Sequence, residues 1–460
     1  MLPPDFREAV ANIVGEAFVK SDEGALEAYG VDSLRRGHAP DLIALPGTTA
    51  HVSALARLCN ERRVPLVVRG GGTGYTGGSV PVHGGLVLSM ERMNRIVEID
   101  THNLLAVVEP NVITGDLQDA VERVGLFYPP DPASLRESAI GGNVAECAGG
   151  PRAFKYGTTR RYVLALEAVL PTGEVIRTGS KAVKNVVGYD LTQLLVGSEG
   201  TLAIITQIVL RLVPKPPVQS TLRATFRNVR AAVAAVDALL RARVVPATLE
   251  LVDRDCLEAV ARYVGASLAP EGTGAVLLLE VDGLREAVVE ESRRVEDACR
   301  AAGATEILRA ATADEREALW RVRREISPSL KVISPAKINH DLVVPRGRVP
   351  DLFELIGRAR REFRLHIACF GHAGDGNIHV NIMVSGEDAG ELARAHEAER
   401  VLFEGVVALE GSISGEHGIG FAKAQYLAIE LSPPTIALMK RIKQAFDPNG
   451  ILNPGKIFPE

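Results

Sequence analysis

One glycine-rich segment constrains the fold of this chain more than any other part of the sequence. Residues 70–78 place six glycines in nine positions, directly after the apolar run Val64–Val68 and Arg69. Glycine lacks a Cβ atom, so such a loop adopts positive φ angles and brings backbone N–H groups close to an anion. We therefore expect this loop to bind a diphosphate, and the question is which cofactor carries it.

The residues after this loop decide between two kinds of dinucleotide site. Gly72–Gly77 fits the G-x-G-x-x-G fingerprint, which requires a helix to begin at the loop. Here Pro81 and two glycines follow, and Leu86–Ser89 has the pattern of a strand. A strand–loop–strand unit would hold phosphates by loop amides alone. The alternatives are a Rossmann unit and a glycine-rich hairpin that binds nothing.

Composition excludes several classes of function. A chain of 460 residues with 46% hydrophobic residues allows two or three domains. The net charge of −5 favours neither nucleic acid nor an anionic membrane as a partner. Five scattered cysteines without a C-x-x-C motif indicate a reducing compartment and argue against a bound iron–sulfur cluster. Without a signal peptide or an apolar stretch of about 20 residues, the protein is expected to be cytoplasmic.

The pattern of the chain changes at a proline-rich segment, Pro214–Pro217. We expect two α+β domains, residues 1–214 with a core of about 38–214, and residues 215–460 with an antiparallel sheet. The expected helices lie at 4–18, 49–63 (capped by Thr48 or Thr49), 229–243 and 284–302. The expected strands lie at 164–170, 174–176, 202–213, 221–226 and 276–281. A short helix capped by Thr114 should bury Leu117, Val121 and Val124.

Two further glycine-rich loops are expected in the first domain, at 138–150 and 197–206, after the proline-rich segment 129–134. Their small residues would let a planar ring and its ribityl chain lie against the backbone. Each loop alone is typical of a surface turn. Together the three loops favour one extended cofactor.

These three loops resemble the FAD-binding domain of the vanillyl-alcohol oxidase and p-cresol methylhydroxylase superfamily. The resemblance implies FAD on a helix-free diphosphate loop. Thr73 follows the glycine run where covalent members commonly carry histidine, so the FAD is expected to be non-covalent. The resemblance places FAD contacts at Arg69, Gly70, Gly71, Gly72, Thr73, Gly74, Gly77, Gly78, Pro130, Asp131, Ser138, Gly141, Gly142, Asn143, Ala148, Gly149, Tyr156, Gly157, Glu199, Gly200, Ile205 and Asn453.

Histidines and a carboxylate gather in two segments near the C-terminus, 369–379 and 413–420. Residues alternate from Asn377, so His379 should face away from the apolar stripe, with His372 on a preceding glycine loop. Two imidazoles and the carboxylate of Glu416 would make a metal site with positions left for substrate. A hydrogen-bonded polar cluster is the alternative.

Both segments resemble the D-2-hydroxyacid dehydrogenase branch of the same superfamily, which includes glycolate oxidase flavoprotein subunits, D-lactate dehydrogenases and D-2-hydroxyglutarate dehydrogenase. The resemblance implies that His372, His379 and Glu416 bind a divalent metal (Zn, Fe or Mn) and that His417 is the base. Arg323, or else Arg324, would hold the substrate carboxylate. The tail 446–460 would return Asn453 to the flavin.

The expected activity is the oxidation of a small D-2-hydroxyacid, glycolate or D-lactate, to its 2-oxoacid, with hydride passing to flavin N5. Asn339 stands where the hydroxyglutarate branch carries lysine, which weighs against a second substrate carboxylate, although Lys337 is near. D-2-hydroxyglutarate oxidation and a non-redox use of FAD are the alternatives. Electrons would pass to an iron–sulfur subunit, an electron-transferring flavoprotein or a quinone. A homodimer and peripheral membrane attachment through a partner are compatible with this scheme.

Overall fold

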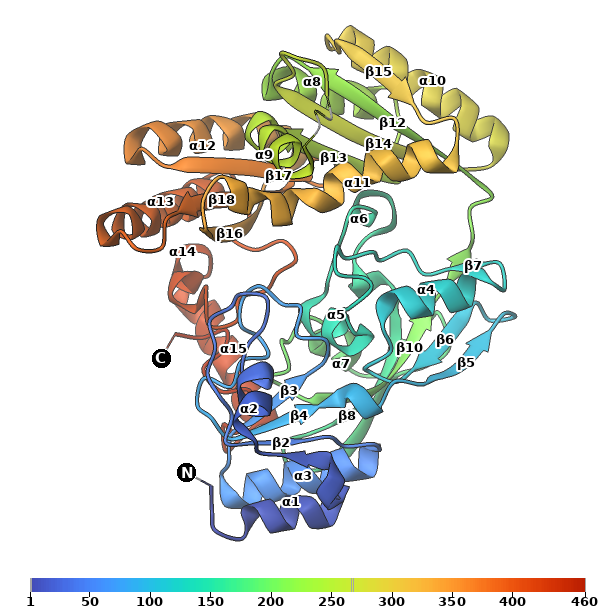
Figure 1. Cartoon of the computed structure of the whole chain (residues 1–460). Coiled ribbons are helices and arrows are strands. Elements are labelled where there is room, and N and C mark those ends of the chain that lie inside the picture. Colours follow the sequence, from blue (N-terminus) through green and yellow to red (C-terminus); the bar gives the residue numbers. More distant parts are fainter. Residues whose placement is uncertain (1, 266, 268, 460) are drawn as a thin grey trace. The chain divides into compact units, whose positions relative to one another are not determined.

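The structure is a computed structural model that describes residues 2–265, 267 and 269–459. It contains two compact units (Figure 1). The first unit contains the described residues of Met1–Gly149, Thr158–Lys215 and Glu416–Glu460, and the second contains those of Gly150–Gly157 and Pro216–Gly415. The chain first passes into the second unit at Gly150, and again at Pro216, inside the segment Pro214–Pro217. Whether the functional domains divide at residue 214 stays a prediction.

The first unit is built on two sheets. One has the strand order β1-β2-β4-β3, and the other the order β5-β6-β10-β8-β9. The strands are β1 (Val19–Lys20), β2 (Leu42–Ala44), β3 (Leu66–Arg69), β4 (Leu86–Ser89), β5 (Ile96–Asp100), β6 (Leu105–Val108), β8 (Val163–Val169), β9 (Val175–Gly179) and β10 (Ile204–Arg211), with β7 (Leu126–Phe127) and β11 (Val213–Pro214) as a separate pair. The helices are α1 (Phe6–Val14), α2 (Glu23–Tyr29), α3 (Thr49–Arg62), α4 (Thr114–Glu122), α5 (Ile140–Glu146), α7 (Leu191–Leu195), α14 (Leu427–Glu430) and α15 (Pro433–Phe446).

The expected strand–loop–strand unit around the first glycine segment is confirmed. β3 and β4 are parallel neighbours, and residues 70–85 between them contain no helix. Apolar side chains of α1 and α3, including Val10 and Leu55, pack with Leu66 and Leu86 of this sheet in one buried core. That core holds the glycine loop at the end of β3.

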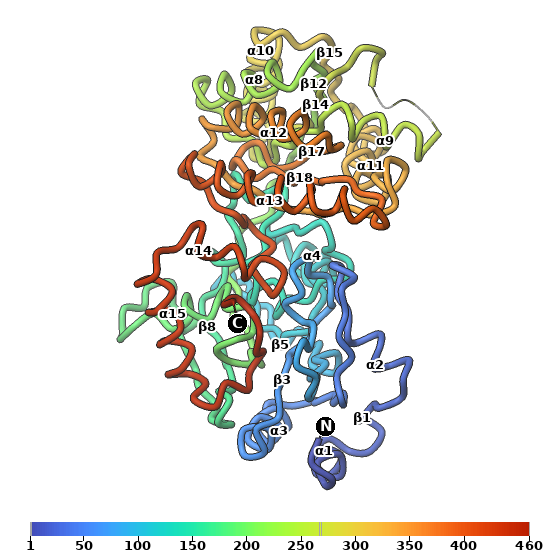
Figure 2. Tube along the Cα trace, turned by 90° about the vertical axis from the view of Figure 1, so that its left-hand side faces the viewer, coloured from blue at the N-terminus to red at the C-terminus, as the bar shows by residue number. Residues whose placement is uncertain are grey.

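The C-terminal tail adds to the edge of the same sheet (Figure 2). Leu452 pairs with Leu66 in a parallel bridge, and the backbone N–H of Asn453 donates to the Leu66 carbonyl at 2.7 Å. Asn453 is therefore held next to the strand that enters the glycine loop, although 375 positions separate it from Gly78.

The second unit is a seven-stranded antiparallel sheet with helices on both faces. Its order is β15-β12-β14-β13-β17-β18-β16. The strands are β12 (Val218–Phe226), β13 (Thr248–Asp253), β14 (Ala275–Gly283), β15 (Glu306–Arg309), β16 (Ala336–Val343), β17 (His366–His372) and β18 (Asn377–Val384). The helices are α6 (Ala153–Tyr156), α8 (Val229–Arg241), α9 (Arg254–Val264), α10 (Arg285–Ala301), α11 (Ala313–Ser329), α12 (Val349–Phe363) and α13 (Ala389–Ala408). One-turn 3₁₀ helices across the chain are Glu16–Phe18, Met90–Arg92, Thr159–Arg161, Leu330–Val332, Arg346–Arg348 and Ala424–Tyr426.

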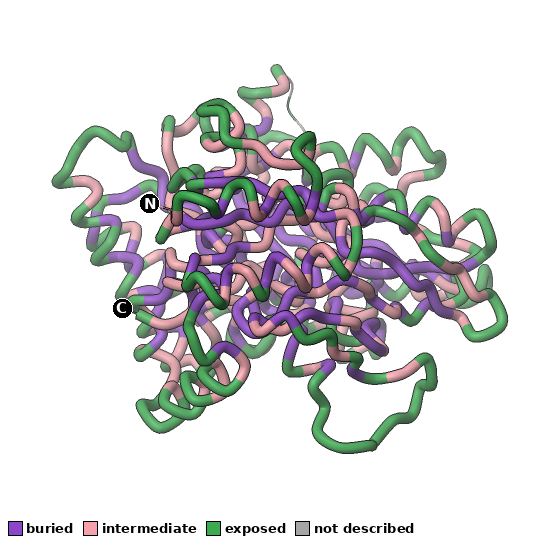
Figure 3. Tube along the Cα trace, turned by 90° about the horizontal axis from the view of Figure 1, so that it is seen from below, coloured by how far each residue is buried: buried purple, intermediate pink, exposed green. Residues whose placement is uncertain are grey.

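The two faces of this sheet differ in polarity. Antiparallel pairing places Glu280 opposite Thr221, Glu250 opposite His372, and His379 opposite Phe370 and Asp341, so these side chains lie on one face. Every residue of β18 is buried, so both faces of the strand are covered; Figure 3 colours the trace by burial. The alternation expected from Asn377 is confirmed.

Three sequence expectations for the first unit are wrong. Residues 140–146 form the helix α5 rather than a loop, because Ile140 and Val144, one helical turn apart, are both buried. Val124 is 48% exposed, since α4 ends at Glu122 before it. Thr114 is the first residue of α4 rather than its cap, and its hydroxyl bonds Ser138 instead.

Candidate active site

The first glycine loop packs against the segment that leads into α5. A Cβ atom at Gly71 would lie 2.3 Å from the Glu137 carbonyl oxygen, and one at Gly78 would lie 2.6 Å from Oε1 of Glu146. The backbone contact at Gly71 excludes a side chain there, whereas the neighbour of Gly78 is the end of the Glu146 side chain. Two of the three segments expected to bind FAD are thus in contact.

The third segment joins them through Asn453. Its Nδ2 donates to the Gly78 carbonyl at 2.8 Å and to the Glu199 carbonyl at 2.7 Å. The Glu199 carboxylate accepts from the backbone N–H groups of Ile419 and Gly420. Burial raises the pKa of Glu199, although these two N–H groups act in the opposite direction. The side chain of Glu199 therefore supports the backbone of residues 419–420.

A polar cluster lies beneath the second segment. The hydroxyl of Thr114 bonds Ser138 at 3.0 Å and accepts from Nδ2 of Asn143 at 2.6 Å. All three side chains are buried. The Pro130 carbonyl accepts from Gln118 at 2.8 Å, which fixes the chain before this segment.

Two of the expected FAD residues make hydrogen bonds within the protein. Arg69 donates to the Val31 carbonyl at 2.6 Å. Tyr156 packs within the second unit, where its hydroxyl donates to Asp282 at 2.7 Å. Gly157 also lies in the second unit. The following predicted contacts lie within the first unit: Thr73, Gly74, Gly77, Asp131, Gly141, Gly142, Ala148, Gly149, Gly200 and Ile205. Their role in binding FAD stays a prediction.

Unpartnered oxygen atoms near these loops fit a ligand that donates hydrogen bonds. Oδ1 of Asn453 and Oδ1 of Asn111 are buried and have no hydrogen-bond partner among the described residues. Asn111 Oδ1 lies 3.9 Å from the Cβ position of Gly70, and the Cβ direction of Gly142 meets no atom within 4 Å. A buried acceptor without a donor costs about 1–3 kcal/mol, so the residues fit a flavin with its ribityl hydroxyls.

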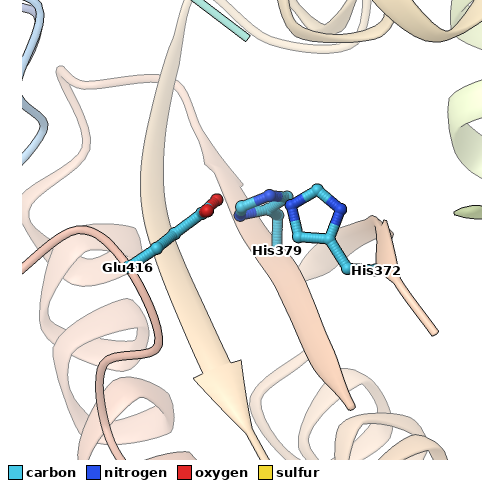
Figure 4. Close-up of side chains that lie close together, drawn as sticks. All are labelled: His372, His379 and Glu416. Carbon is cyan, nitrogen blue, oxygen red and sulfur yellow. The ribbon is translucent and has the colours of Figure 1, made fainter. Parts of the chain in front are cut away.

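His372, His379 and Glu416 come together as the sequence predicted (Figure 4). One ligand atom from each lies within 4.8 Å of the other two. Both histidines are buried, and the Glu416 side chain points toward His379. His372 is the last residue of β17 rather than part of a glycine loop, because it still pairs with Asn377 and the turn begins after it. Two nitrogen donors and one carboxylate oxygen fit a divalent transition metal.

Sequence reasoning missed two carboxylates that support this cluster. Glu250 bonds Nδ1 of His372 at 2.5 Å from the neighbouring strand. Asp341 accepts from the backbone N–H of Gly415 at 2.8 Å, which fixes the chain directly before Glu416. Both acids are fully buried. Glu250 stands between Leu249 and Leu251, and Asp341 directly precedes the apolar run 342–344, so a carboxylate next to apolar strand residues was the available signal.

Arg323 and Arg324 differ sharply in environment. Arg323 is buried on α11, and its Nε donates to Oε2 of Glu250 at 2.5 Å. Its guanidinium lies over the Phe370 ring, 4.6 Å from the centroid. Arg324 is exposed and pairs with Glu317. Only Arg323 is connected to the metal-ligating residues.

His417 lies beside the first glycine loop. Its carbonyl accepts from the Thr76 hydroxyl at 2.9 Å, and its ring is 5.1 Å from the Tyr75 ring. Gly149 of the second segment approaches the preceding residue so closely that a Cβ there would be 2.7 Å from Oε2 of Glu416. The first unit therefore brings Glu416 and His417 to the loops expected to bind FAD.

Comparison with known proteins identifies the family. Residues 215–457 match the family described as FAD linked oxidases, C-terminal domain, and residues 40–179 match an FAD binding domain. The chain belongs to the FAD-linked oxidase family. This FAD-linked oxidase is 43% identical over 460 residues to "Glycolate oxidase subunit GlcD" of Bacillus subtilis, covering 100% of this chain and 97% of that protein. It is 35% identical to "D-lactate dehydrogenase" of Anaerostipes hadrus, covering 91% of this chain and 89% of that protein.

The fold of this FAD-linked oxidase also matches the expected superfamily. Its structure superposes on p-cresol methylhydroxylase with a TM-score of 0.82 at 20% identity, covering 98% of this chain and 96% of the other. The expected fold class, enzyme class and FAD cofactor are confirmed. Among the described residues, no helix is long and apolar enough to cross a membrane.

Proposed function

We propose that this enzyme oxidises a small D-2-hydroxyacid, glycolate or D-lactate, to the 2-oxoacid. The observation that carries the proposal is the His372–His379–Glu416 cluster, in which both histidines are buried, with Arg323 connected to it, in a FAD-linked oxidase chain. The names of the relatives that span this chain, glycolate oxidase subunit and D-lactate dehydrogenase, support the same substrate class.

The two cofactors would supply different chemistry. FAD, held non-covalently, supplies a two-electron acceptor for a hydride from the substrate carbon. A divalent metal held by His372, His379 and Glu416 supplies Lewis acidity toward a hydroxyl oxygen.

The remaining steps belong to the protein side chains. Arg323 provides a cation for the substrate carboxylate through charge-assisted hydrogen bonds from its guanidinium. The imidazole of His417, next to Glu416 in the chain, takes the hydroxyl proton and holds it. The buried surroundings of His372 and His379 exclude water from the reacting group.

The electrons must then leave the protein. Among the described residues, His372, His379 and Glu416 are the one group of histidine, cysteine or acidic side chains positioned to bind a metal, so no second set of ligands for a redox metal is present there. We infer an external acceptor, a protein subunit or a quinone. The word "subunit" in the glycolate oxidase relatives favours a protein.

Anaerobic mixing with excess substrate tests the proposal. Glycolate or D-lactate should bleach the flavin absorbance, whereas L-lactate should not. D-2-hydroxyglutarate and D-malate should bleach it slowly, because Asn339 offers no cation. If no hydroxyacid reduces the flavin, the chain uses FAD without redox chemistry and the proposal is wrong.

A substitution of His417 tests its role as base. His417→Ala should retain FAD but slow flavin reduction by about 100- to 10,000-fold. His102→Ala, on an exposed turn, is the matched control and should reduce at the wild-type rate. Undiminished bleaching in His417→Ala would exclude the base assignment.

A further inference from the structure

Glu250 occupies an unusual position between two groups with different roles. It lies on β13, directly opposite His372 on β17. One carboxylate oxygen, Oε1, bonds Nδ1 of His372, and the other, Oε2, accepts from Nε of Arg323, each at 2.5 Å. The Glu250 side chain is 0% exposed and that of Arg323 is 10% exposed. A single buried carboxylate thus connects a metal-ligating residue to the candidate substrate cation.

Burial makes this connection energetically significant. An ionised carboxylate in the protein interior requires both partners and hydrogen bonds on both oxygen atoms. Glu250 meets this requirement, because its Oε1 bonds His372 and its Oε2 accepts from Arg323. Both bonds draw on the electron density of one carboxylate group, so a stronger bond to one oxygen weakens the bond to the other.

The same bond fixes the chemistry of His372. When Nδ1–H donates to Glu250, Nε2 is the nitrogen left with a lone pair. The His372 and His379 rings meet edge to face, with centroids 5.3 Å apart. The carboxylate therefore selects the tautomer and ring orientation that metal binding requires.

We propose that Glu250 is a positioning residue that couples metal affinity at His372 to the state of the Arg323 cation. The proposal rests on the function proposed above. A bound metal would draw electron density from His372 and strengthen its Nδ1–H bond to Glu250. Glu250 then holds Arg323 less tightly, and the guanidinium becomes available to a substrate carboxylate. Thermodynamic linkage is reciprocal. If metal binding weakens the bond between Glu250 and Arg323, then loss of that bond must strengthen metal binding by the same free energy.

Zinc affinity of the FAD-loaded protein, stripped of metal with a chelator, provides the test. A chromogenic chelator competing for Zn²⁺ would report the dissociation constant without any enzymatic turnover. Glu250→Gln keeps the size of the side chain but removes its charge, and should weaken Zn²⁺ binding by about 10- to 100-fold. Glu280→Gln is the matched control, since Glu280 is a buried acid on the same sheet face that accepts from Thr221 and Trp320 instead. It should bind Zn²⁺ as the wild type does.

A double-mutant cycle separates coupling from simple support. In Arg323→Met, the Glu250 carboxylate keeps only its bond to His372, and this bond becomes stronger. The substitution should therefore tighten Zn²⁺ binding about fivefold or more. In the Glu250→Gln background the same substitution should change Zn²⁺ affinity less than twofold. Arg323→Lys should fall between wild type and Arg323→Met, and it carries the test if Glu250→Gln does not fold.

The outcomes distinguish the two proposals. If wild-type protein binds no Zn²⁺, Mn²⁺ or Fe²⁺, the metal part of the proposed function is wrong. If wild type binds metal but Arg323→Met and Arg323→Lys leave its affinity unchanged, the coupling is wrong while the metal site stands. Equal Zn²⁺ affinity in Glu250→Gln and wild type would likewise overturn the positioning role.

Discussion

Glu199 and Gly420, 221 positions apart in the sequence, are joined by a buried hydrogen bond of 2.7 Å from the Gly420 N–H to the Glu199 carboxylate. The other carboxylate oxygen accepts from the N–H of Ile419 at 2.8 Å. These bonds fix the backbone immediately after Glu416 and His417. A residue of the third glycine segment thus sets the position of the proposed base.

Loss of this carboxylate should release that backbone. Glu199→Ala removes two charge-assisted hydrogen bonds and should lower the unfolding free energy of the first unit by about 3 kcal/mol. It should also lower kcat by about 100-fold, because a small displacement of a catalytic group is costly. Thermal unfolding and steady-state turnover measure the two effects. Glu199→Gln, which retains one acceptor, should lie between; wild-type kcat in Glu199→Ala would contradict the positional role.

The sequence predicted the strands around the first glycine loop and the metal cluster because both signals are local. Glycine spacing and the absence of a helix pattern after Gly78 determine the loop type. The alternation after Asn377 places His379 on one face of a strand. Both inferences require only neighbouring residues, and the structure confirms the strand pair and the alternation. That His372, His379 and Glu416 bind a metal stays a prediction.

The supporting carboxylates could not be predicted because their partners are distant in sequence. Glu250 bonds His372 across 122 positions, and Asp341 bonds Gly415 across 74. Strand order in the seven-stranded sheet decides these pairs, and periodicity carries no information on strand order. The helix α5 was not predicted for a different reason. Its two consecutive glycines are unfavourable in helices, and they hid the helical spacing of the buried residues Ile140 and Val144.

Gly142 provides a direct test of where FAD lies. Gly142→Ala adds a methyl group whose direction meets no protein atom within 4 Å, and alanine favours the helix α5 by about 1 kcal/mol. The variant should therefore fold at least as stably as wild type but lose most of its FAD during gel filtration. Flavin absorbance per protein measures this. Gly357→Ala in α12 is the control and should retain FAD.

The two neighbouring arginines should give opposite results. Arg323→Ala should lower kcat/KM by about 100- to 1,000-fold, mainly through KM, because paired charged hydrogen bonds contribute ~3–4 kcal/mol. Arg324→Ala removes an exposed pair with Glu317 and should change kcat/KM less than about threefold. Steady-state kinetics with D-lactate separates them. A large loss in Arg324→Ala with none in Arg323→Ala would reverse the assignment.

Asp32 should give the first unit a distinctive pH dependence. Burial raises its pKa from 3.8 to about 6, although the Leu34 N–H opposes the change. The folded state therefore binds more protons between these values, and stability falls as pH rises through about 6. Asp32→Asn has no group to titrate here and should not lose this stability. The loss in wild type is up to about 3 kcal/mol of unfolding free energy, for a pKa raised by roughly two units.

Melting temperatures between pH 5 and 8 check this expectation. Asp32→Asn should gain stability over wild type as pH rises to about 7 and keep a constant advantage above it. Asp119→Asn is the control, because the Arg136 hydrogen bond lowers the pKa of Asp119 and leaves nothing to titrate in this range. A pH-independent difference between Asp32→Asn and wild type would contradict the assignment.

Removal of one ligand should uncouple metal content from flavin content. His379→Ala takes a buried nitrogen donor from the cluster while leaving the FAD loops untouched, since His379 belongs to the second unit and the loops to the first. The variant should retain FAD but lose metal and nearly all D-lactate oxidation. Elemental analysis beside the flavin spectrum measures both. His396→Ala, on a half-exposed face of α13 where its ring bonds Glu399, is the control and should retain metal and activity. Full activity in a metal-free His379→Ala preparation would mean that His417 and Arg323 act without a metal, and would reduce the cluster to a structural one.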